Sequence, residues 1–425
     1  MSSNISVFKS ILGSTIFKLA SSLVAFVSVP LLLTTLGTND YGIWVTLTAL
    51  VAWLNLFDFG SGYSLKNKVT EALVESDTKA LQSLIAGTIQ FYLLSTIVIL
   101  IVFGFCLFFI RAFRENFLLT IIIYLPVILA FPFTLGHFMM QGLKKFNLFN
   151  SLLLIQTIIW LLFIVLFKLE FFKPDIYRIA VVYSLLYVLV NFSIFFISLK
   201  HLNFNWKELL TWNHFKSSKD SLLVGGRFFL LQVSSLLLFS LGNLMTYNNL
   251  QIRDVAQFDT VNKIYLMGMT IFNVLITIYW SEISHAKALN DRLMLKKIQK
   301  QLLLFSSLFS FGTIAVSFFI PFFINYWTRG IITVNLYQLL PFSALVIIQF
   351  FAYSGAVFLN AFEDLKGQVI LSVMAAIFII PLAEYFFYLK VGIGSVPLAS
   401  AILIFPTLIY VLDKSNKCIA NLNKL

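Results

Sequence analysis

The sequence has few charged residues, few histidines and only two cysteines. Charged side chains make up 11% of its 425 residues, whereas soluble domains carry about 25%, so the chain lacks the charged surface that a soluble enzyme needs. Cys106 and Cys418 are too few for a disulfide framework or a cysteine-based metal cluster. The four histidines are scattered, without an HExxH pair, and no Walker-type phosphate-binding loop occurs. We therefore find no catalytic constellation, and an ATP-driven pump would need a partner chain.

Long apolar runs are what the sequence has instead. Hydrophobic residues make up 60% of it, with a mean hydropathy of +0.92, which is enough for roughly twelve spans of about 20 residues. The runs are continuously apolar and too long for the alternating strands of a membrane barrel, so they predict helices. The predicted spans are 10–34, 40–64, 83–110, 117–140, 147–168, 176–199, 221–248, 256–283, 301–327, 332–359, 367–389 and 393–412.

The net charge of +12 is interpreted first through membrane topology. If the N-terminus is placed in the cytoplasm, the loops on that side carry more Lys and Arg than the loops on the other side. The sequence therefore predicts a multi-pass membrane protein with both termini in the cytoplasm. The excess positive charge is assigned to orientation and to anionic lipid heads, and no nucleic-acid partner is expected.

The two halves of the chain resemble each other. Six predicted spans in residues 1–200 precede a polar cytoplasmic linker at 201–220, and six more lie in 221–425. The loops at 36–42 and 250–256 both place an aspartate four residues after a leucine, and the inner turn after the fourth span of each half is also alike. We expect two pseudo-symmetric six-helix bundles around a central cavity, with the substrate site between them.

Three basic residues fall inside predicted spans: Lys18, Arg227 and Lys263. An ionisable group in a span costs about 2.5–3.5 kcal/mol on insertion scales, so it usually faces a wet cavity or a partner. Lys18 and Arg227 lie in the matching first spans of the two halves, where we expect them to meet across a cavity and bind a diphosphate. Two alternatives remain open: that both side chains snorkel to the membrane surface, and that Lys263 forms a structural ion pair with Asp259 at i−4.

Acidic residues in the predicted spans are candidates for gating or ion coupling. Asp58 lies near the inner end of the second span, where it can pair with Lys66 or Lys18 or carry a proton. Lys66, Asp259 and Glu384 are assigned the same role. A structural ion pair for Asp58 and an interhelical hydrogen bond for Glu384 are the alternatives.

Short motifs in the first half resemble those of the polysaccharide transporter family. They are Pro30 with Leu36-Gly37 and Tyr41-Gly42, Asp58-Phe59-Gly60 with Lys66, and Gln141-Gly142-Leu143 with Phe146. In order and placement they are similar to those of the O-antigen flippases (Wzx type) of the multidrug/oligosaccharidyl-lipid/polysaccharide (MOP) exporter superfamily. The resemblance covers essentially the whole chain, although Lys66 stands where that family usually favours Arg.

The resemblance implies a V-shaped, MATE-like all-α membrane fold of twelve helices that rocks between inward- and outward-open states. The implied substrate is undecaprenyl-pyrophosphate-linked oligosaccharide, moved from the cytoplasmic to the periplasmic leaflet of the bacterial inner membrane. Lys18, Arg227 and Lys263 are then the candidates for binding its pyrophosphate and glycan. We expect coupling to a proton or sodium gradient, no other cofactor, no metal site, and a polysaccharide polymerase and chain-length regulator as partners.

Other functions stay open beside this resemblance. A cation-coupled multidrug exporter of the same superfamily should have carboxylates dominating its cavity, whereas Lys and Arg are at least as prominent here. A membrane glycan polymerase or ligase usually carries a large outer loop, and the predicted outer loops are short. A lipid II flippase of the superfamily generally has two more spans than this chain accommodates.

Overall fold

The computed structural model describes residues 2–62, 65–66, 68–70, 78–173, 175–210, 229–362 and 364–420. The regular structure in these ranges is helical, and no strand occurs in them. By length and apolar composition, nine of the described helices can cross a membrane, or up to eleven segments can if each of two bent helix pairs is one span. Long helices are expected in lipid because they pair their backbone N–H and C=O groups internally.

The chain divides into two compact units, Met1–Gln232 and Val233–Leu425. This division falls a short distance after the linker expected at 201–220. The first half of that linker is described: it contains the end of a long helix and a 3-10 turn at Trp206–Leu210. Residues 211–228 lie outside the described residues.

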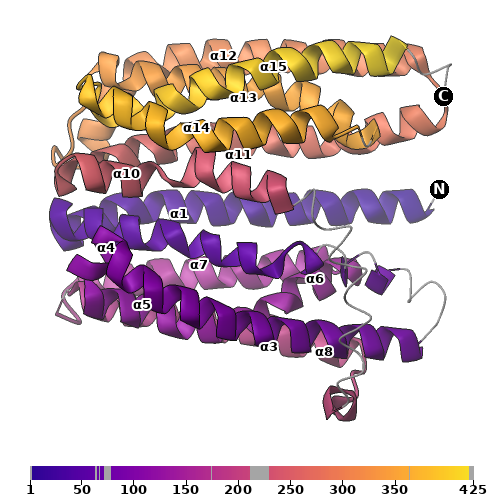
Figure 1. Ribbon diagram of the computed structural model, residues 1–425, viewed down its shortest axis with the longest axis horizontal. Helices are drawn as coiled ribbons and strands as arrows, with labels where there is room; N and C mark the ends of the chain where they lie inside the picture. Colours follow the sequence, from indigo (N-terminus) through magenta and orange to yellow (C-terminus); the bar gives the residue numbers. More distant parts are fainter. Residues whose placement is uncertain are drawn as a thin grey trace. The chain divides into compact units, whose positions relative to one another are not determined.

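The first unit is a bundle of long helices joined by short turns. Its elements are α1 (Ser2–Ala49), η1 (Leu50–Asp58), α3 (Thr78–Phe109), α4 (Arg111–Glu115), α5 (Phe117–Leu129), η2 (Phe131–Thr134), α6 (Leu135–Gly142), α7 (Phe146–Lys168), α8 (Ile176–His201) and η3 (Trp206–Leu210). α1 packs against α7, and α5 and α6 pack against α8 (Figure 1). Gly136 allows α6 to approach α8 closely, because a Cβ there would lie 2.6 Å from the Cα of Phe195.

A break at Gly37 divides α1 into two helical segments. Gly37 has φ 76° and ψ 173°, a backbone conformation that is essentially restricted to glycine. The apolar segment Ile16–Asp58 contains 43 residues. That length corresponds to about 65 Å of helix at 1.5 Å per residue, or twice the hydrocarbon core of a bilayer. Counted as two segments, and with each bent pair as one, the described helices correspond to the twelve predicted spans, of which the seventh, 221–248, is described only from residue 229 onward.

The fourth predicted span is one of the bent pairs. α5 and the segment Phe131–Gly142 meet at 53°. The bend coincides with the 3-10 turn η2, which carries Pro132 in its first two residues. Proline has no N–H to donate to the preceding helical turn, so the α-helical ladder cannot continue unchanged through this point.

In the second unit, several helices pack around one central helix. It contains most of the helix Phe229–Ser240, followed by α10 (Gly242–Asn249), α11 (Ile252–Ala288), α12 (Arg292–Trp327), α13 (Leu336–Phe362), α14 (Lys366–Tyr388), η5 (Gly392–Gly394) and α15 (Ser395–Ala420). α13 packs against α11, α12 and α15. Its Phe358 is fully buried beside Leu295 and Val411, and Ser306 and Ser354 join α12 to α13 through their hydroxyls at 2.7 Å.

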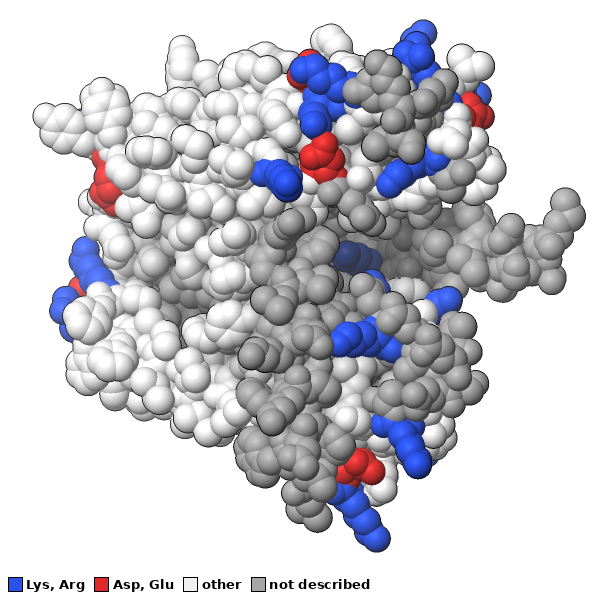
Figure 2. Space-filling model, turned by 45° about the vertical axis from the view of Figure 1, so that its right-hand side comes forward, with Lys and Arg blue, Asp and Glu red and all other residues white. Residues whose placement is uncertain are grey.

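The outer surfaces of the helices are strongly apolar. Large side chains such as Phe109 (82% exposed) and Phe322 (76%) project from the protein, an arrangement that would be unfavourable in water but suits acyl chains. In Figure 2 the visible charged side chains gather toward the ends of the helices, with a largely uncharged band between them. This distribution is that of a multi-pass membrane protein.

Candidate functional site

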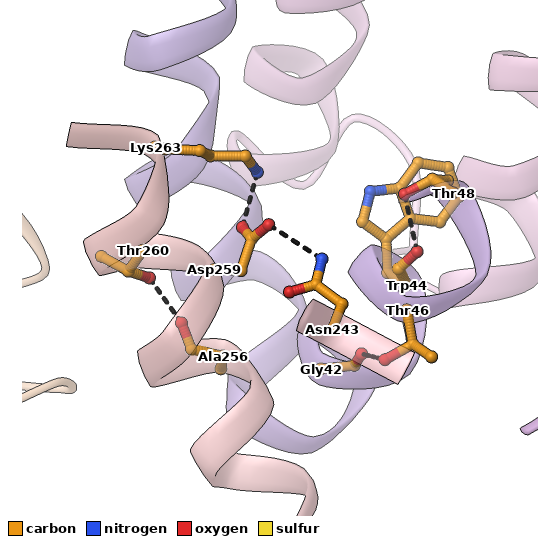
Figure 3. A network of polar contacts seen from close by, with 9 residues as sticks. All are labelled: Gly42, Trp44, Thr46, Thr48, Asn243, Ala256, Asp259, Thr260 and Lys263. Atoms are coloured by element: carbon orange, nitrogen blue, oxygen red, sulfur yellow. Dashed lines mark hydrogen bonds and ion pairs between the residues drawn. The ribbon is translucent and has the colours of Figure 1, made fainter. Parts of the chain in front are cut away.

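An ion pair on α11 joins two of the residues expected at the site. Lys263 Nζ lies 2.6 Å from Asp259 Oδ2, one helical turn away, and Asn243 of α10 donates its side-chain amide to Asp259 Oδ1 at 3.2 Å (Figure 3). The side chain of Asp259 is 7% exposed and that of Lys263 is 35% exposed. The buried carboxylate therefore has both a cation and an amide donor, which offsets the cost of its desolvation. The i−4 ion pair, one of the alternatives raised by the sequence, is present.

The span that carries Asn243 is broken. The helix Phe229–Ser240 and α10 are bent by 43° at Leu241, and α10 has the polar sequence GNLMTYNN. Gly242 lets α10 lie close to α11 at the break, because a Cβ there would come within 2.2 Å of the Phe258 ring. Discontinuous spans of this kind line substrate and ion sites in membrane transporters. The break therefore marks this part of the second unit as the candidate site.

The far end of α10 contacts another expected residue. Asn249 donates its side-chain amide to Glu384 Oε1 of α14 at 2.9 Å. Both side chains are exposed, so the structure shows an interhelical hydrogen bond near the ends of α10 and α14 rather than a deeply buried carboxylate. Through Asn243 and Asn249, the short helix α10 thus contacts two of the acidic residues predicted to gate or couple transport.

Asp58 in the first unit has a backbone partner. Its side chain is buried, and Oδ1 accepts a hydrogen bond from the Gly60 N–H at 2.8 Å. Phe59 and Gly60 have φ of 49° and 77°, so the carboxylate stabilises a left-handed turn at the end of η1. Among the described residues no ion pair joins Asp58 to Lys18 or Lys66. The expected pairing of Asp58 with Lys66 or Lys18 stays a prediction, and the structure shows the backbone N–H of Gly60 as a partner of the carboxylate.

Lys66 lies partly buried near the C-terminal end of α6. The Thr70 hydroxyl donates to the backbone carbonyls of both Lys66 and Gly142, at 3.1 and 3.0 Å. Burial lowers the pKa of the Lys66 ammonium from its ordinary value, because desolvation disfavours the charged form. An anionic group that reached Lys66 would offset this penalty.

Lys18 is exposed on α1. It precedes the break at Gly37 by 19 residues, or about 28 Å of helix, which nearly equals the thickness of the hydrocarbon core. The expected place of Lys18 in a cavity, and the alternative that its side chain snorkels to the membrane surface, both stay predictions. Arg227 lies outside the described residues, so its pairing with Lys18 stays a prediction. In the described ranges, no group of three His, Cys, Asp or Glu side chains could hold a metal ion.

A hydroxyl cluster in the second unit was missed by the sequence reasoning. The Tyr265 hydroxyl lies 2.9 Å from Ser317 Oγ and 2.8 Å from Ser343 Oγ, and the two serines are 2.9 Å apart. It joins α11, α12 and α13 where all three side chains are buried or nearly so. The available signal was the helical spacing of Ser306, Ser310 and Ser317 along α12, which marks the face of that helix toward α13.

Comparison with known sequences gives a short match. No family model matches the chain. The curated "Putative O-antigen export protein" of Yersinia pseudotuberculosis is 40% identical over 53 residues, which is 12% of this chain and 12% of that protein. The match therefore spans about an eighth of that relative's length.

Comparison with solved structures covers nearly the whole chain. An inward-facing multidrug resistance MATE family transporter of the MOP superfamily superposes with a TM-score of 0.70 at 13% identity, over 97% of this chain and 96% of that chain. A MOP superfamily transporter from Pyrococcus furiosus gives 0.67 at 13% identity, over 98% and 97%. A MATE protein in complex with MaL6 gives 0.65 at 12% identity, over 98% and 97%. The chain is therefore a multi-pass membrane protein with the fold of the MATE transporters of the MOP superfamily, the fold that the resemblance implied.

Proposed function

We propose that the chain is a flippase that moves undecaprenyl-pyrophosphate-linked oligosaccharide from the cytoplasmic to the periplasmic leaflet of the bacterial inner membrane by alternating access. The glycan head crosses through the protein while the lipid tail stays in the bilayer. The transporter fold supports export as the kind of activity. The 53-residue likeness to a protein named for O-antigen export supports this class of substrate.

The pairing of the predicted site residues in the described part of the chain is the observation that carries the proposal. The carboxylates of Asp58, Asp259 and Glu384 each have a hydrogen-bond or ion-pair partner within the protein. Exposed Lys18, by contrast, is paired with no acidic side chain of the described part of the chain. A carrier of cations needs open carboxylates, whereas a carrier of a diphosphate head needs open ammonium or guanidinium groups. Among the predicted site residues, this contrast supports an anionic head group.

Ion coupling belongs to the same proposal. A proton or sodium ion would bind at Asp58, Asp259 or Glu384 when that carboxylate releases its present partner during the transport cycle, because carboxylates within spans are the usual sites for such ions. A polysaccharide polymerase and a chain-length regulator would then act on the translocated unit at the outer surface. A multidrug exporter remains the second candidate, since the solved structure with the TM-score of 0.70 is named for multidrug resistance.

Deletion of the gene in its host separates the two candidates. We expect surface glycan to be lost while its lipid-linked unit accumulates in a form protected from glycosidases added to the outside of spheroplasts. Expression of the intact chain from a plasmid should restore the glycan. If drug sensitivity rises while surface glycan is unchanged, the flippase proposal is wrong and the multidrug candidate holds.

A further inference from the structure

The second unit contains a cavity of about 150 Å³ that none of the predicted charged residues in the described part of the chain lines. It lies between the helix Phe229–Ser240, α10, α11, α13 and α15. α11 contributes side chains at helical spacing from Phe258 to Asn273, and α13 contributes a matching face from Phe342 to Tyr353. Three side-chain amides, those of Asn262, Asn273 and Gln349, line it, and we call this cavity the amide pocket.

Gln349 places a side-chain amide without a described hydrogen-bond partner in the lining of the amide pocket. Its side chain is 6% exposed, and in the described part of the chain it hydrogen-bonds to no residue. A side-chain amide carries two donors and an acceptor, and leaving such a group buried without partners is unfavourable. A ligand that brings hydroxyl or amide groups into the cavity would supply these partners.

The walls of the amide pocket exclude charge as a basis for recognition. Among the residues that the structure describes, its lining contains no Asp, Glu, Lys, Arg or His side chain. The nearby ionic residues Asp259 and Lys263 each follow a lining residue by one position on α11, about 100° around the helix, and they pair with each other. The ligand is therefore uncharged, and the diphosphate of the proposed substrate is not what this cavity binds.

Aromatic side chains form much of the apolar lining of the amide pocket. Tyr265 and Phe342 stack with centroids 5.8 Å apart, and Phe258 lies 5.4 Å from Phe342. Aromatic faces offer a flat apolar surface, and a few convergent amides and hydroxyls fix the orientation of a ligand against it. A sugar ring presents both features, C–H groups on its faces and hydroxyls around its edge.

The volume limits the ligand to one ring. Cavities near 150 Å³ in other proteins admit a single six-membered ring such as benzene. The geometry points to a binding site for one neutral sugar residue of the glycan, a hexose or N-acetylhexosamine rather than a uronic acid, held by the Gln349 and asparagine amides over the aromatic rings. This inference rests on the proposed flippase function for its biological meaning, but not for its chemistry.

Binding to purified protein tests the pocket directly. The intact chain in detergent is heated with methyl glucoside, methyl galactoside or N-acetylglucosamine, and separately with glucuronate, at matched concentrations. We expect at least one neutral sugar to raise the melting temperature and glucuronate to leave it unchanged. No shift with any neutral sugar, or an equal shift with glucuronate, would overturn the inference.

The variant Gln349→Leu links that binding to the pocket. It removes an unpartnered amide at nearly constant volume, so the sugar-free protein should unfold at the same or a higher temperature. The sugar-induced shift should disappear, and glycan export in the complemented deletion strain should fall about threefold to tenfold, as expected for the loss of one hydrogen-bonding group. Gln301→Leu on α12, whose partner is the Tyr279 hydroxyl, is the matched control and should keep both.

The two proposals can fail separately. If deletion of the gene leaves surface glycan intact while the neutral-sugar shift depends on Gln349, the flippase function is wrong and the pocket stands. If deletion abolishes glycan export but Gln349→Leu binds sugar and exports like the unaltered chain, the pocket is a water-filled space and this inference is wrong.

Discussion

Lys263 reaches back one turn along α11 to Asp259 and places its ammonium 2.6 Å from the carboxylate. The two partners differ in burial, because the aspartate is 7% exposed and the lysine 35%. The lysine thus neutralises an anion that is enclosed by the helices, while part of its own side chain remains accessible. Lys263 is therefore already engaged, which makes it a less available phosphate ligand than the sequence suggested.

Loss of Lys263 should destabilise the protein more than loss of the whole pair. Lys263→Met leaves Asp259 buried without this cation, with an expected cost of about 1–3 kcal/mol. The double variant Asp259→Asn with Lys263→Met should recover part of that loss, since both charges are removed. Thermal unfolding of the four proteins in detergent gives the coupling energy. Additive effects would show that the pair contributes nothing beyond its separate residues.

The break at Gly37 should not tolerate a side chain. Because the backbone has φ 76° and ψ 173° at this position, an alanine would introduce a conformational strain of about 1–3 kcal/mol or force the turn to change. Gly37→Ala is expected to lower both the melting temperature and the membrane yield. Gly104→Ala in α3 is the control, because nothing lies within 4 Å of the added Cβ; it should be neutral or slightly stabilising. Equal effects of the two variants would contradict this account.

Substitutions at Asp58 separate a structural from an ion-coupling role. Asp58→Asn keeps an oxygen that can accept the Gly60 N–H, so folding should be retained, whereas Asp58→Ala removes it and should cost about 0.5–1.5 kcal/mol. If the carboxylate carries a proton or sodium ion, Asp58→Asn also stops transport despite normal yield. Export assays beside size-exclusion profiles measure both properties. Full export by the asparagine variant would assign Asp58 to the turn alone.

Neutralising Lys18 should slow glycan export without affecting folding. The side chain is exposed, so its electrostatic contribution is that of a surface contact, and Lys18→Gln should reduce the export rate about twofold to fivefold. Lys18→Arg keeps the charge and should remain near the unaltered rate. Lys79→Gln at the start of α3, also exposed, is the matched loss of charge elsewhere. A rate for Lys18→Gln equal to that of Lys79→Gln would remove Lys18 from the substrate path.

The helices were predictable from the sequence because their cause is local. A run of apolar residues is compatible with lipid only as a helix, so composition alone places the predicted spans. The Asp259–Lys263 ion pair was also predictable from the sequence, because side chains four residues apart share a helix face. The break at Gly37 lies in the predicted loop at 36–42, where the two helical segments of α1 meet directly instead of being joined by a longer loop.

Contacts between segments far apart in the chain could not be predicted from the sequence. Asn249 and Glu384 are 135 residues apart, and nothing in either span identifies the other as its partner. Asp58 accepts a hydrogen bond from the Gly60 N–H because the path of the chain at Phe59 and Gly60 brings this donor near the carboxylate. The amide pocket likewise depends on several helices presenting particular faces to one another.

The sequence by itself determined that this protein lies in a membrane as a series of helices, and which of their residues are ionisable. Hydrophobic transfer and backbone pairing act on each segment separately, so no neighbour is needed to specify them. Only the tertiary structure decided which polar groups are satisfied and which stay open, because lipid offers no hydrogen bonds and each buried group takes the partner that packing brings to it.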